Sequence, residues 1–475
     1  MKKQFFNDSR EKKASQTSRS DFQAAQRTEK NMRKDSHANW KSSFRPKKTV
    51  SIRRELFDEK MIPEDSAKII ANFDKVLEDV TRLSGKQKVT LPAAVKSLSH
   101  QLTDERGTRR LGYMNEASFL SAYVNYFMWW NLVRLCRLFA NLPKSAFDFD
   151  DNTVALDIGS GPLTIPIALW LSRPELRSKK IVWYCLDLSS SALSLGEEIY
   201  LSIAAKTIAA SSAANAEETE RRKNSEKTAE PWKIIRIKGS LGTAIREKAD
   251  FITCGNIFNE IIQRNEMPTD FLAKKYSSQI ISYLKKEPSQ KQNILIIEPG
   301  DPHSARFISL IRDAFIRQNF TPIAPCPHME SCPMAGRTGG RATNAYGKNT
   351  KWCNFAFSTD SAPKSLLRLS EKAGIPKERA SLSFIFVSRS LENKNETEFK
   401  SKTVGNEKIF IRIASDFIRL PEIHKSGYYA CSKYGMLLAI DENLVQPKNG
   451  ELLQIAAPEN LEERDKKSGA LIIKI

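Results

Sequence analysis

Four cysteines in the last third of the chain have the residue type and spacing of a metal centre: Cys326, Cys332, Cys353 and Cys431. Successive cysteines are separated by 5, 20 and 77 residues. The chain begins MKKQFFNDSR, without an apolar signal segment, so we expect a reducing compartment, where clustered thiols hold metals more often than they form disulfides. Three thiols would come from one loop and the fourth from a distant strand, so the centre would tie two parts of the protein together.

An iron–sulfur cluster and a structural zinc ion are both compatible with four thiolates. The Cys-Pro steps at Cys326 and Cys332 favour the cluster, and the Cys-x2–4-Cys knuckles on which zinc sites usually build do not occur in the sequence. His328 follows Cys326 by two residues, so we expect its ring to line the site rather than to replace a thiolate.

A second site is predicted where a strand meets a glycine turn and a helix, in LDIGSGPLTIPIALWL. Gly159 and Gly161 allow the backbone to approach a ligand, and the helix start presents free N–H groups. A dinucleotide motif needs Gly or Ala where this chain has Thr164. Asp157 instead fits S-adenosylmethionine, whose ammonium needs a carboxylate, and Asp187 ends the next strand, where an acid accepts the ribose hydroxyls. The alternative is a tight turn that only packs the helix on the sheet.

The chemistry of methyl transfer is less clearly marked. The stretch CGNIFNE places Asn256 and Glu260 at the same sheet edge, where both are candidates by position for catalysis and Asn256 also for cofactor contact. The Asn-Pro-Pro-aromatic signature of amine methylation and the Pro-Cys signature of cytosine C5 enzymes do not occur there, so no catalytic base is assigned. We expect Cys254, like Cys136 and Cys185, to be a buried core thiol.

Continuous apolar runs alternate with helical stretches from about residue 152, which predicts an α/β fold with a doubly wound, mainly parallel sheet. The expected strands are TVALDIG, IVWYCLD, IIRIKGS, ADFITCGN and NILIIEPG, with SLSFIFVSRS as a further strand or edge. The chain divides into a disordered basic arm (1–50), a helical region (55–145), an S-adenosylmethionine-type core (150–325) with an insertion (203–230), a cysteine loop (326–360), and C-terminal strands with a small β module (361–475).

These motifs resemble the methyltransferase-like family associated with the small ribosomal subunit, whose members occur in bacteria and on mitochondrial ribosomes. The matching pieces are LDIGSGP, CLDLSSSAL, GNIFNE, IIEPGDP, CPHMESCP with WCNF, LSFIFVSR and KSGYYACSKYG. The resemblance implies a class I methyltransferase (Rossmann-like) fold and a [4Fe-4S] cluster held by the four cysteines. The chain departs from the family pattern at Leu163, where a third glycine is usual and a bulky side chain would crowd the cofactor, and at Asn354, where His is usual.

The resemblance also implies a place in ribosome biogenesis or translation. One hypothesis is an S-adenosylmethionine-dependent methyltransferase acting on ribosomal RNA or a small-subunit protein. The other is a non-catalytic iron–sulfur assembly factor that keeps a degenerate methyltransferase fold. We expect a monomer in a bacterial-type cytoplasm, with the mitochondrial matrix as the alternative.

The charge of the chain points to an acidic partner. The formal net charge is +20, and residues 1–50 carry 14 Lys and Arg against 5 Asp and Glu. Nucleic acid is the leading candidate for such a partner. The Gly- and Arg-rich loop at 336–351 is a second candidate for RNA contact, with a solvated loop as the alternative. The apolar helix at 119–139 contains Arg134 and Arg137, which excludes it as a membrane span.

Overall fold

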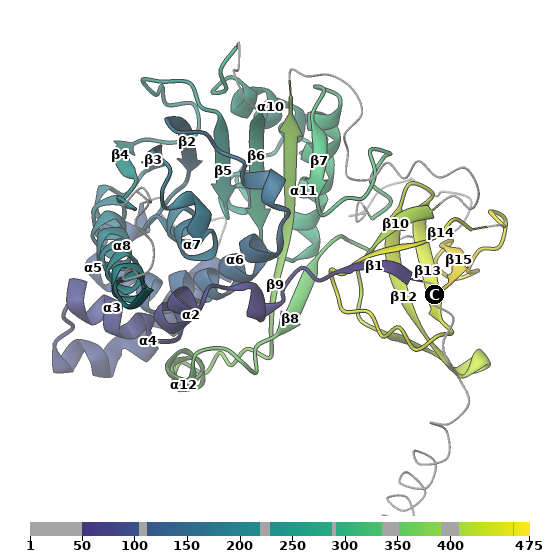
Figure 1. Ribbon diagram of the computed structural model, residues 1–475, viewed down its shortest axis with the longest axis horizontal. Helices are drawn as coiled ribbons and strands as arrows, with labels where there is room; N and C mark the ends of the chain where they lie inside the picture. The colour runs from purple at the N-terminus through teal and green to yellow at the C-terminus, as the bar shows by residue number, and fades with distance from the viewer. Residues whose placement is uncertain are drawn as a thin grey trace, which may run out of the picture. The chain divides into compact units, whose positions relative to one another are not determined.

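The computed structural model describes residues 50–103, 112–218 (backbone only from 211), 229–286, 291–334, 351–390, 408–458 and 460–475. All of them fall within one unit, Thr49–Ile475, which is built on two β-sheets (Figure 1). The basic arm expected at 1–50, apart from its last residue, and most of the Gly- and Arg-rich loop lie outside the described residues.

The larger sheet has the strand order β4-β3-β2-β5-β6-β9-β7, with β8 paired to β9. The strands are β2 (Thr153–Ile158), β3 (Ile181–Asp187), β4 (Lys233–Lys238), β5 (Phe251–Gly255), β6 (Gln292–Glu298), β7 (Thr321–Ala324), β8 (Phe355–Ser358) and β9 (Arg379–Arg389). Strands β2 to β6 are parallel, whereas β9 runs antiparallel to both β6 and β7. This is the topology of the class I methyltransferase fold, so the predicted fold class is confirmed.

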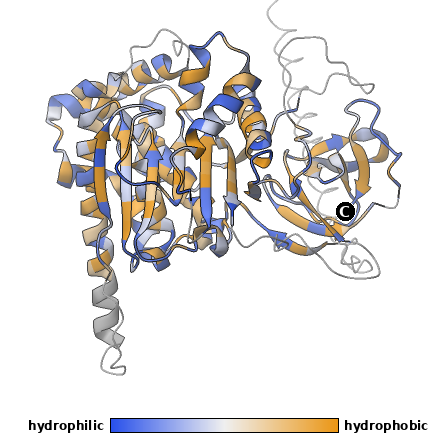
Figure 2. Cartoon of the chain, turned by 90° about the horizontal axis from the view of Figure 1, so that it is seen from above, coloured by the Kyte–Doolittle hydropathy of each residue, from blue (hydrophilic) through white to orange (hydrophobic). Residues whose placement is uncertain are grey.

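Helices cover both faces of this sheet, because its central strands are apolar on both sides. Along β2, Val154 and Leu156 belong to one apolar cluster and Ala155 to another. The first cluster packs against α9 (Phe258–Gln263), α10 (Thr269–Ile281) and α11 (Pro302–Ile316), and the second against α6 (Trp129–Asn141), α7 (Thr164–Ser172) and α8 (Ser190–Glu218). In Figure 2 the apolar colour runs along these strands and the sides of the helices that face them.

The N-terminal region is helical, as the apolar spacing predicts. It contains η1 (Glu59–Met61), α2 (Glu64–Ala71), α3 (Phe73–Val80), α4 (Gly85–Thr103), η2 (Tyr113–Asn115), α5 (Ala117–Ala122), a π-helical turn η3 (Tyr123–Met128), α6 and η4 (Lys144–Phe147). Among the described helices, none has the length and apolar character that crossing a membrane would require.

The second sheet has the order β1-β14-β10-β12-β13-β15, with β11 paired to β12. Its strands are β1 (Val50–Arg54), β10 (Lys408–Ile413), β11 (Ile418–Leu420), β12 (Lys425–Ser432), β13 (Gly435–Asp441), β14 (Leu452–Ala456) and β15 (Leu471–Lys474). The remaining short helices are η5 (Pro174–Leu176), α12 (Lys364–Lys372) and η6 (Pro421–Ile423).

Strand β9 confirms SLSFIFVSRS as a further strand of the larger sheet, where it lies between β6 and β7 because its run of buried apolar residues needs cover on both faces. Two segments differ from the division expected from sequence. Strand β1 lies between the expected arm and the expected helical region, and it pairs with β14. The first part of the expected insertion at 203–230 continues α8 as one helix.

Candidate functional site

The glycine turn after β2 is shaped by backbone contacts with the end of β3. The amides of Gly159 and Ser160 both donate to the carbonyl oxygen of Leu186, at 2.8 and 3.1 Å. Gly159 has φ +72°, and a Cβ atom at this position would lie 2.0 Å from Cγ2 of Ile257. Only glycine therefore fits where the turn meets the segment after β5.

Asp187 holds the same turn from the end of β3. One carboxylate oxygen accepts a hydrogen bond from the amide of Gly161 and the other from that of Ser189, each at 2.8 Å. Burial raises the pKa of Asp187, and these two N–H donors oppose the shift. A carboxylate has about four acceptor sites, so both oxygens can still accept further hydroxyl donors.

A cavity of about 560 Å³ opens at this carboxyl edge of the sheet. Four of the predicted cofactor residues and one further catalytic candidate line it: Gly159, Gly161, Asp187, Asn256 and Glu260. In open α/β sheets the crevice outside the carboxyl ends of the strands is where ligands bind. The structure thus brings these predicted residues into one pocket.

Asp157 lies directly beneath the cavity and does not line it. Its side chain is 1% exposed, and Oδ1 accepts a hydrogen bond of 2.6 Å from the hydroxyl of Thr253. Oδ2 is buried and has no hydrogen-bond partner among the described residues. Burial raises the pKa of Asp157 to about 7. A buried carboxylate oxygen without a donor, next to the glycine turn, fits the ammonium group of an S-adenosylmethionine cofactor.

The segment after β5 is fixed by Glu298 at the end of β6. Its two carboxylate oxygens accept from the amides of Phe258 and Asn259, at 2.8 and 3.1 Å, and so cap the start of α9. Glu298 is fully buried, and burial raises its pKa to about 8. Glu298 does not line the cavity, and its role is that of a cap that directs α9, and with it Glu260, toward the cavity.

Leu163 does not crowd the cofactor end of the pocket. The residue takes φ +57°, a conformation that glycine adopts more easily than leucine, but its side chain is fully buried in the main apolar core. It is not among the residues that line the cavity. The expected obstruction is therefore wrong.

The four predicted cysteine ligands come from both sheets. Cys326 and Cys332 follow β7, Cys353 precedes β8, and Cys431 lies in β12 of the second sheet. The thiols are close enough for their charges to interact, since Cys332, Cys326 and Cys353 raise the pKa of Cys431 in addition to the larger effect of burial. Among the described residues, however, no three His, Cys, Asp or Glu side chains already form a group that could hold a metal ion.

Two buried arginines face the thiols. Arg312 is 2% exposed and donates to Sγ of Cys326 at 3.2 Å and to the carbonyl oxygen of His328 at 2.8 Å. Arg412 pairs with Cys431 across β10 and β12 and donates to the carbonyl oxygen of Pro325 at 2.8 Å. Nε2 of His328 lies 2.9 Å from Sγ of Cys431, so this ring lines the cluster of thiols. Buried thiols beside two cations fit an anionic metal–thiolate centre in their donor chemistry.

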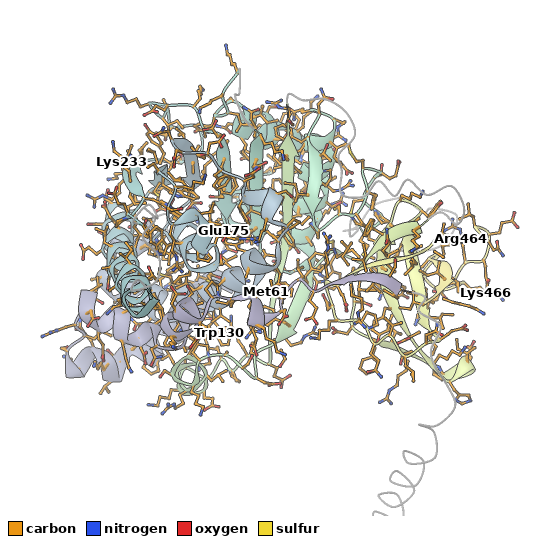
Figure 3. All side chains as sticks on the ribbon, viewed as in Figure 1. Met61, Trp130, Glu175, Lys233, Arg464 and Lys466 are labelled. Carbon is orange, nitrogen blue, oxygen red and sulfur yellow. The ribbon has the colours of Figure 1, made fainter. Side chains whose placement is uncertain are left out.

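The sequence favours core packing for the aromatic residues around Tyr123, Phe127 and Trp130, with base stacking as the alternative. The structure places these three rings on the cavity together with Arg134 and Lys377, and we call this group of five the outer half of the pocket. Only Lys377 lies outside the N-terminal helices, and the sequence does not single it out. Trp130, labelled in Figure 3, lies among those helices.

Fold and pocket together define this chain as a methyltransferase-like protein of class I. A family model described as "Mitochondrial small ribosomal subunit Rsm22" matches residues 118–420. The chain belongs to this Rsm22 family, which confirms the resemblance seen in the sequence. The family description is mitochondrial, which argues against the expected bacterial-type cytoplasmic location.

Solved structures similar to this chain are methyltransferases. Magnesium protoporphyrin IX methyltransferase from Synechocystis PCC 6803, with bound SAM, is 12% identical, with 62% of this chain and 97% of that chain covered and a TM-score of 0.28. A SAM-dependent methyltransferase from Geobacter sulfurreducens, in complex with S-adenosyl-L-homocysteine, is 11% identical, with 54% and 89% covered and a TM-score of 0.27. Likeness at this level carries no argument about function. No curated protein sequence matches the chain.

Proposed function

We propose that this protein binds S-adenosylmethionine and works on the small ribosomal subunit as a methyltransferase of ribosomal RNA or of a small-subunit protein. The observation that carries the proposal is the unpartnered buried Oδ2 of Asp157 beneath a pocket lined by Gly159, Gly161 and Asp187. Membership of a family named for the small ribosomal subunit supports the choice of partner.

In this proposal specific residues of this chain bind the ammonium, the adjacent backbone-facing part and the ribose of the cofactor. Asp157 would hold the methionine ammonium, the glycine turn would carry the adjacent backbone, and Asp187 would accept the ribose hydroxyls. S-adenosylmethionine supplies an electrophilic methyl group, and in-line transfer depends mostly on how the acceptor is positioned. Asn256 and Glu260 lie on the pocket wall and remain position-based candidates for orienting an acceptor.

Binding of S-adenosylhomocysteine to the full-length protein, measured by calorimetry, tests the cofactor site. Gly159→Ala should abolish this binding, because the added Cβ would collide with Ile257 and displace the turn. Gly374→Ala is the matched control, since Gly374 also has positive φ but has no atom within 4 Å of an added Cβ. If wild type did not bind, or if both variants lost affinity equally, the proposed cofactor site would be wrong.

We further propose that Cys326, Cys332, Cys353 and Cys431 hold a [4Fe-4S] cluster, with zinc as the alternative. A cubane cluster with four thiolates carries about two negative charges, which the buried guanidinium groups of Arg312 and Arg412 would balance. Because Cys431 belongs to the second sheet, the bound metal would fasten that sheet to the methyltransferase fold, as metal binding elsewhere adds to folding free energy.

The metal proposal is tested by the visible spectrum and the iron, sulfide and zinc content of anaerobically purified protein. We expect a broad band near roughly 400 nm that disappears in Cys326→Ser and in Cys431→Ser. Cys185→Ser is the control, since this buried cysteine lies in β3, away from the four. A colourless protein with one zinc ion would establish the alternative, and protein without either metal would contradict both.

A non-catalytic assembly factor is the second candidate function. It is favoured by the absence, in the sequence after β5, of both methylation signatures, and by a cysteine centre with no redox substrate. Small subunits from cells that lack this protein, incubated with it and methyl-labelled S-adenosylmethionine, separate the two. Incorporated label establishes the methyltransferase, whereas cofactor binding without incorporation favours the assembly factor.

A further inference from the structure

The outer half of the pocket is lined by residues of the N-terminal helices and of the loop after α12. This outer half is walled by Tyr123, Phe127 and Trp130 and carries two cations, Arg134 and Lys377. Neither the glycine turn nor Asp187 contributes to it. Its contents therefore require a ligand group other than the cofactor groups assigned above.

The aromatic wall is built by an unusual piece of backbone. Residues Tyr123–Met128 form a π-helical turn between α5 and α6. Such turns are rare and often occur at functional sites. The rings of Tyr123 and Phe127 stack, with centroids 5.9 Å apart and planes 27° from parallel. Both side chains are half-buried and line the cavity, so part of the stacked pair is open to it.

Two cations lie beside this wall. The ammonium of Lys377 is 5.4 Å from the ring centroid of Trp130 and 5.7 Å from that of Tyr126. Arg134 donates to the carbonyl oxygen of Ser381 at 2.6 Å and to the side chain of Asn131, and its Nε is buried without a partner in the described structure.

The acidic groups of the pocket lie elsewhere. Asp187 and Glu260 lie near one another, since the charge of Glu260 contributes to the raised pKa of Asp187, although burial contributes more. The outer half is thus cationic and aromatic, whereas both carboxylates that line the cavity lie outside it, as does a third cation, Arg264. Such a surface attracts an anion with a flat face and repels the ammonium or guanidinium of a protein side chain.

We propose that the outer half of the pocket is the acceptor subsite and that it takes a single unstacked nucleotide of an RNA strand. Its base would lie on Tyr123 and Phe127, and its phosphate would contact Lys377 and Arg134. Bases extruded from RNA are commonly stacked on aromatic side chains and read there. The proposal rests on the proposed function in one respect, since the methyl donor must occupy the other half of the same cavity.

Binding of small nucleotides to full-length protein saturated with S-adenosylhomocysteine tests the subsite. The probes are the four ribonucleoside 5′-monophosphates and the matching nucleosides, followed by tryptophan fluorescence and calorimetry. We expect at least one monophosphate to bind more tightly than its nucleoside. Lys377→Gln should lower the affinity for that monophosphate about tenfold and leave the affinity for the nucleoside unchanged, because only the phosphate contact is lost. Phe127→Leu should lower the affinities for the monophosphate and for the nucleoside, because the stacking surface is lost.

Lys372→Gln is the matched control, because it removes the same charge at a residue that is exposed at the end of α12 and does not line the pocket. It should leave all affinities unchanged. Equal monophosphate affinity in wild type and Lys377→Gln would overturn the proposal. Loss of S-adenosylhomocysteine affinity in Lys377→Gln would overturn it differently, by assigning the cations to the cofactor carboxylate. Failure of wild type to bind S-adenosylhomocysteine would instead contradict the proposed function.

Discussion

Asp157 is a carboxylate whose surroundings favour its neutral form when no cofactor is bound. It is almost completely buried, and one of its oxygens has no donor within the described structure. A cationic ligand group is what such an oxygen lacks. Burial of this carboxylate therefore lowers the stability of the free protein, and pairing it with a cationic ligand group would contribute to binding affinity.

The pH dependence of stability should reveal this cost. The folded-state pKa of Asp157 is raised to about 7 from an ordinary 3.8, so its contribution to stability is present below about pH 4 and is lost as pH rises through 7. Relative to Asp157→Asn, the free wild-type protein should lose up to about 3 kcal/mol of unfolding free energy between pH 4.5 and 7.5. Urea denaturation at both pH values measures the difference.

The comparison with the Asn variant removes the contribution of Glu298, which titrates in an overlapping range because burial raises its pKa to about 8. Asp148→Asn, at an exposed carboxylate, should follow wild type. A pH profile that is the same for wild type and Asp157→Asn would show that Asp157 stays ionised in the free protein, and the argument from burial would fail.

Single residues were predictable where the sequence alone imposes chemistry. Two glycines after a strand and an acid at the end of the next strand are a local pattern, and the structure places all three on one cavity. Lys377 was not predictable in this way, because it lies in a loop more than 200 residues from the helix whose rings it faces. Glu298 belongs to the expected strand NILIIEPG, but its capping role could not be predicted, because it depends on where α9 begins.

At the scale of elements, the pocket depends on how α9 is held. This helix has only six residues, and the carboxylate of Glu298 accepts hydrogen bonds from its first two amides. A helix this short has little stability of its own. Its direction, and hence the position of Glu260 on the pocket wall, is set by the carboxylate at the end of the neighbouring strand.

Glu298→Ala should therefore lower both the stability of the protein and its affinity for S-adenosylhomocysteine. Two buried amides would lose their acceptors, at a cost of about 2 to 4 kcal/mol in unfolding free energy. Glu298→Gln keeps one acceptor oxygen and should cost about half as much. Chemical denaturation measures the free energy of unfolding, and calorimetry measures the affinity for S-adenosylhomocysteine.

Asp301→Ala is the matched capping control. Asp301 accepts from the amides of His303 and Ser304 at the start of α11, a helix that does not line the cavity. This variant should cost about 1 kcal/mol and leave cofactor affinity unchanged. If Glu298→Ala lost stability while keeping full affinity, α9 would not be the element that shapes the pocket.

The elements that sequence reasoning missed are strand β1 and the π-helical turn, and neither carries a local signal of its own. The central strands of the larger sheet are continuous apolar runs and identify themselves. Strand β1 is VSIRR, short and half polar, and it becomes a strand because it pairs with β14 about 400 residues later. The π-helical turn has the same composition as the α-helices around it, so no local signal separates them.

At the scale of the whole molecule, charge and the cysteine centre act on different surfaces. The cysteines lie where the two sheets meet, and the two arginines that face them are buried. Those charges are unavailable to a partner. The proposed contact with RNA would have to use other basic residues, and residues 1–48 carry a net +9 of the total of +20.

Removal of residues 1–48 should therefore reduce the salt dependence of RNA binding. Each phosphate contact on a single strand contributes about 0.7 to the slope of log affinity against log salt, so the 14 Lys and Arg of this segment set an upper limit of about 10 on the change. The measurement is fluorescence anisotropy with a labelled small-subunit RNA fragment between about 50 and 200 mM salt. Cofactor affinity is the internal control and should be unchanged, because the pocket is built from residues 102 onward. An unchanged slope after the deletion would show that the phosphates are contacted by the folded unit instead, and the charge of the first 48 residues would have no part in recognition.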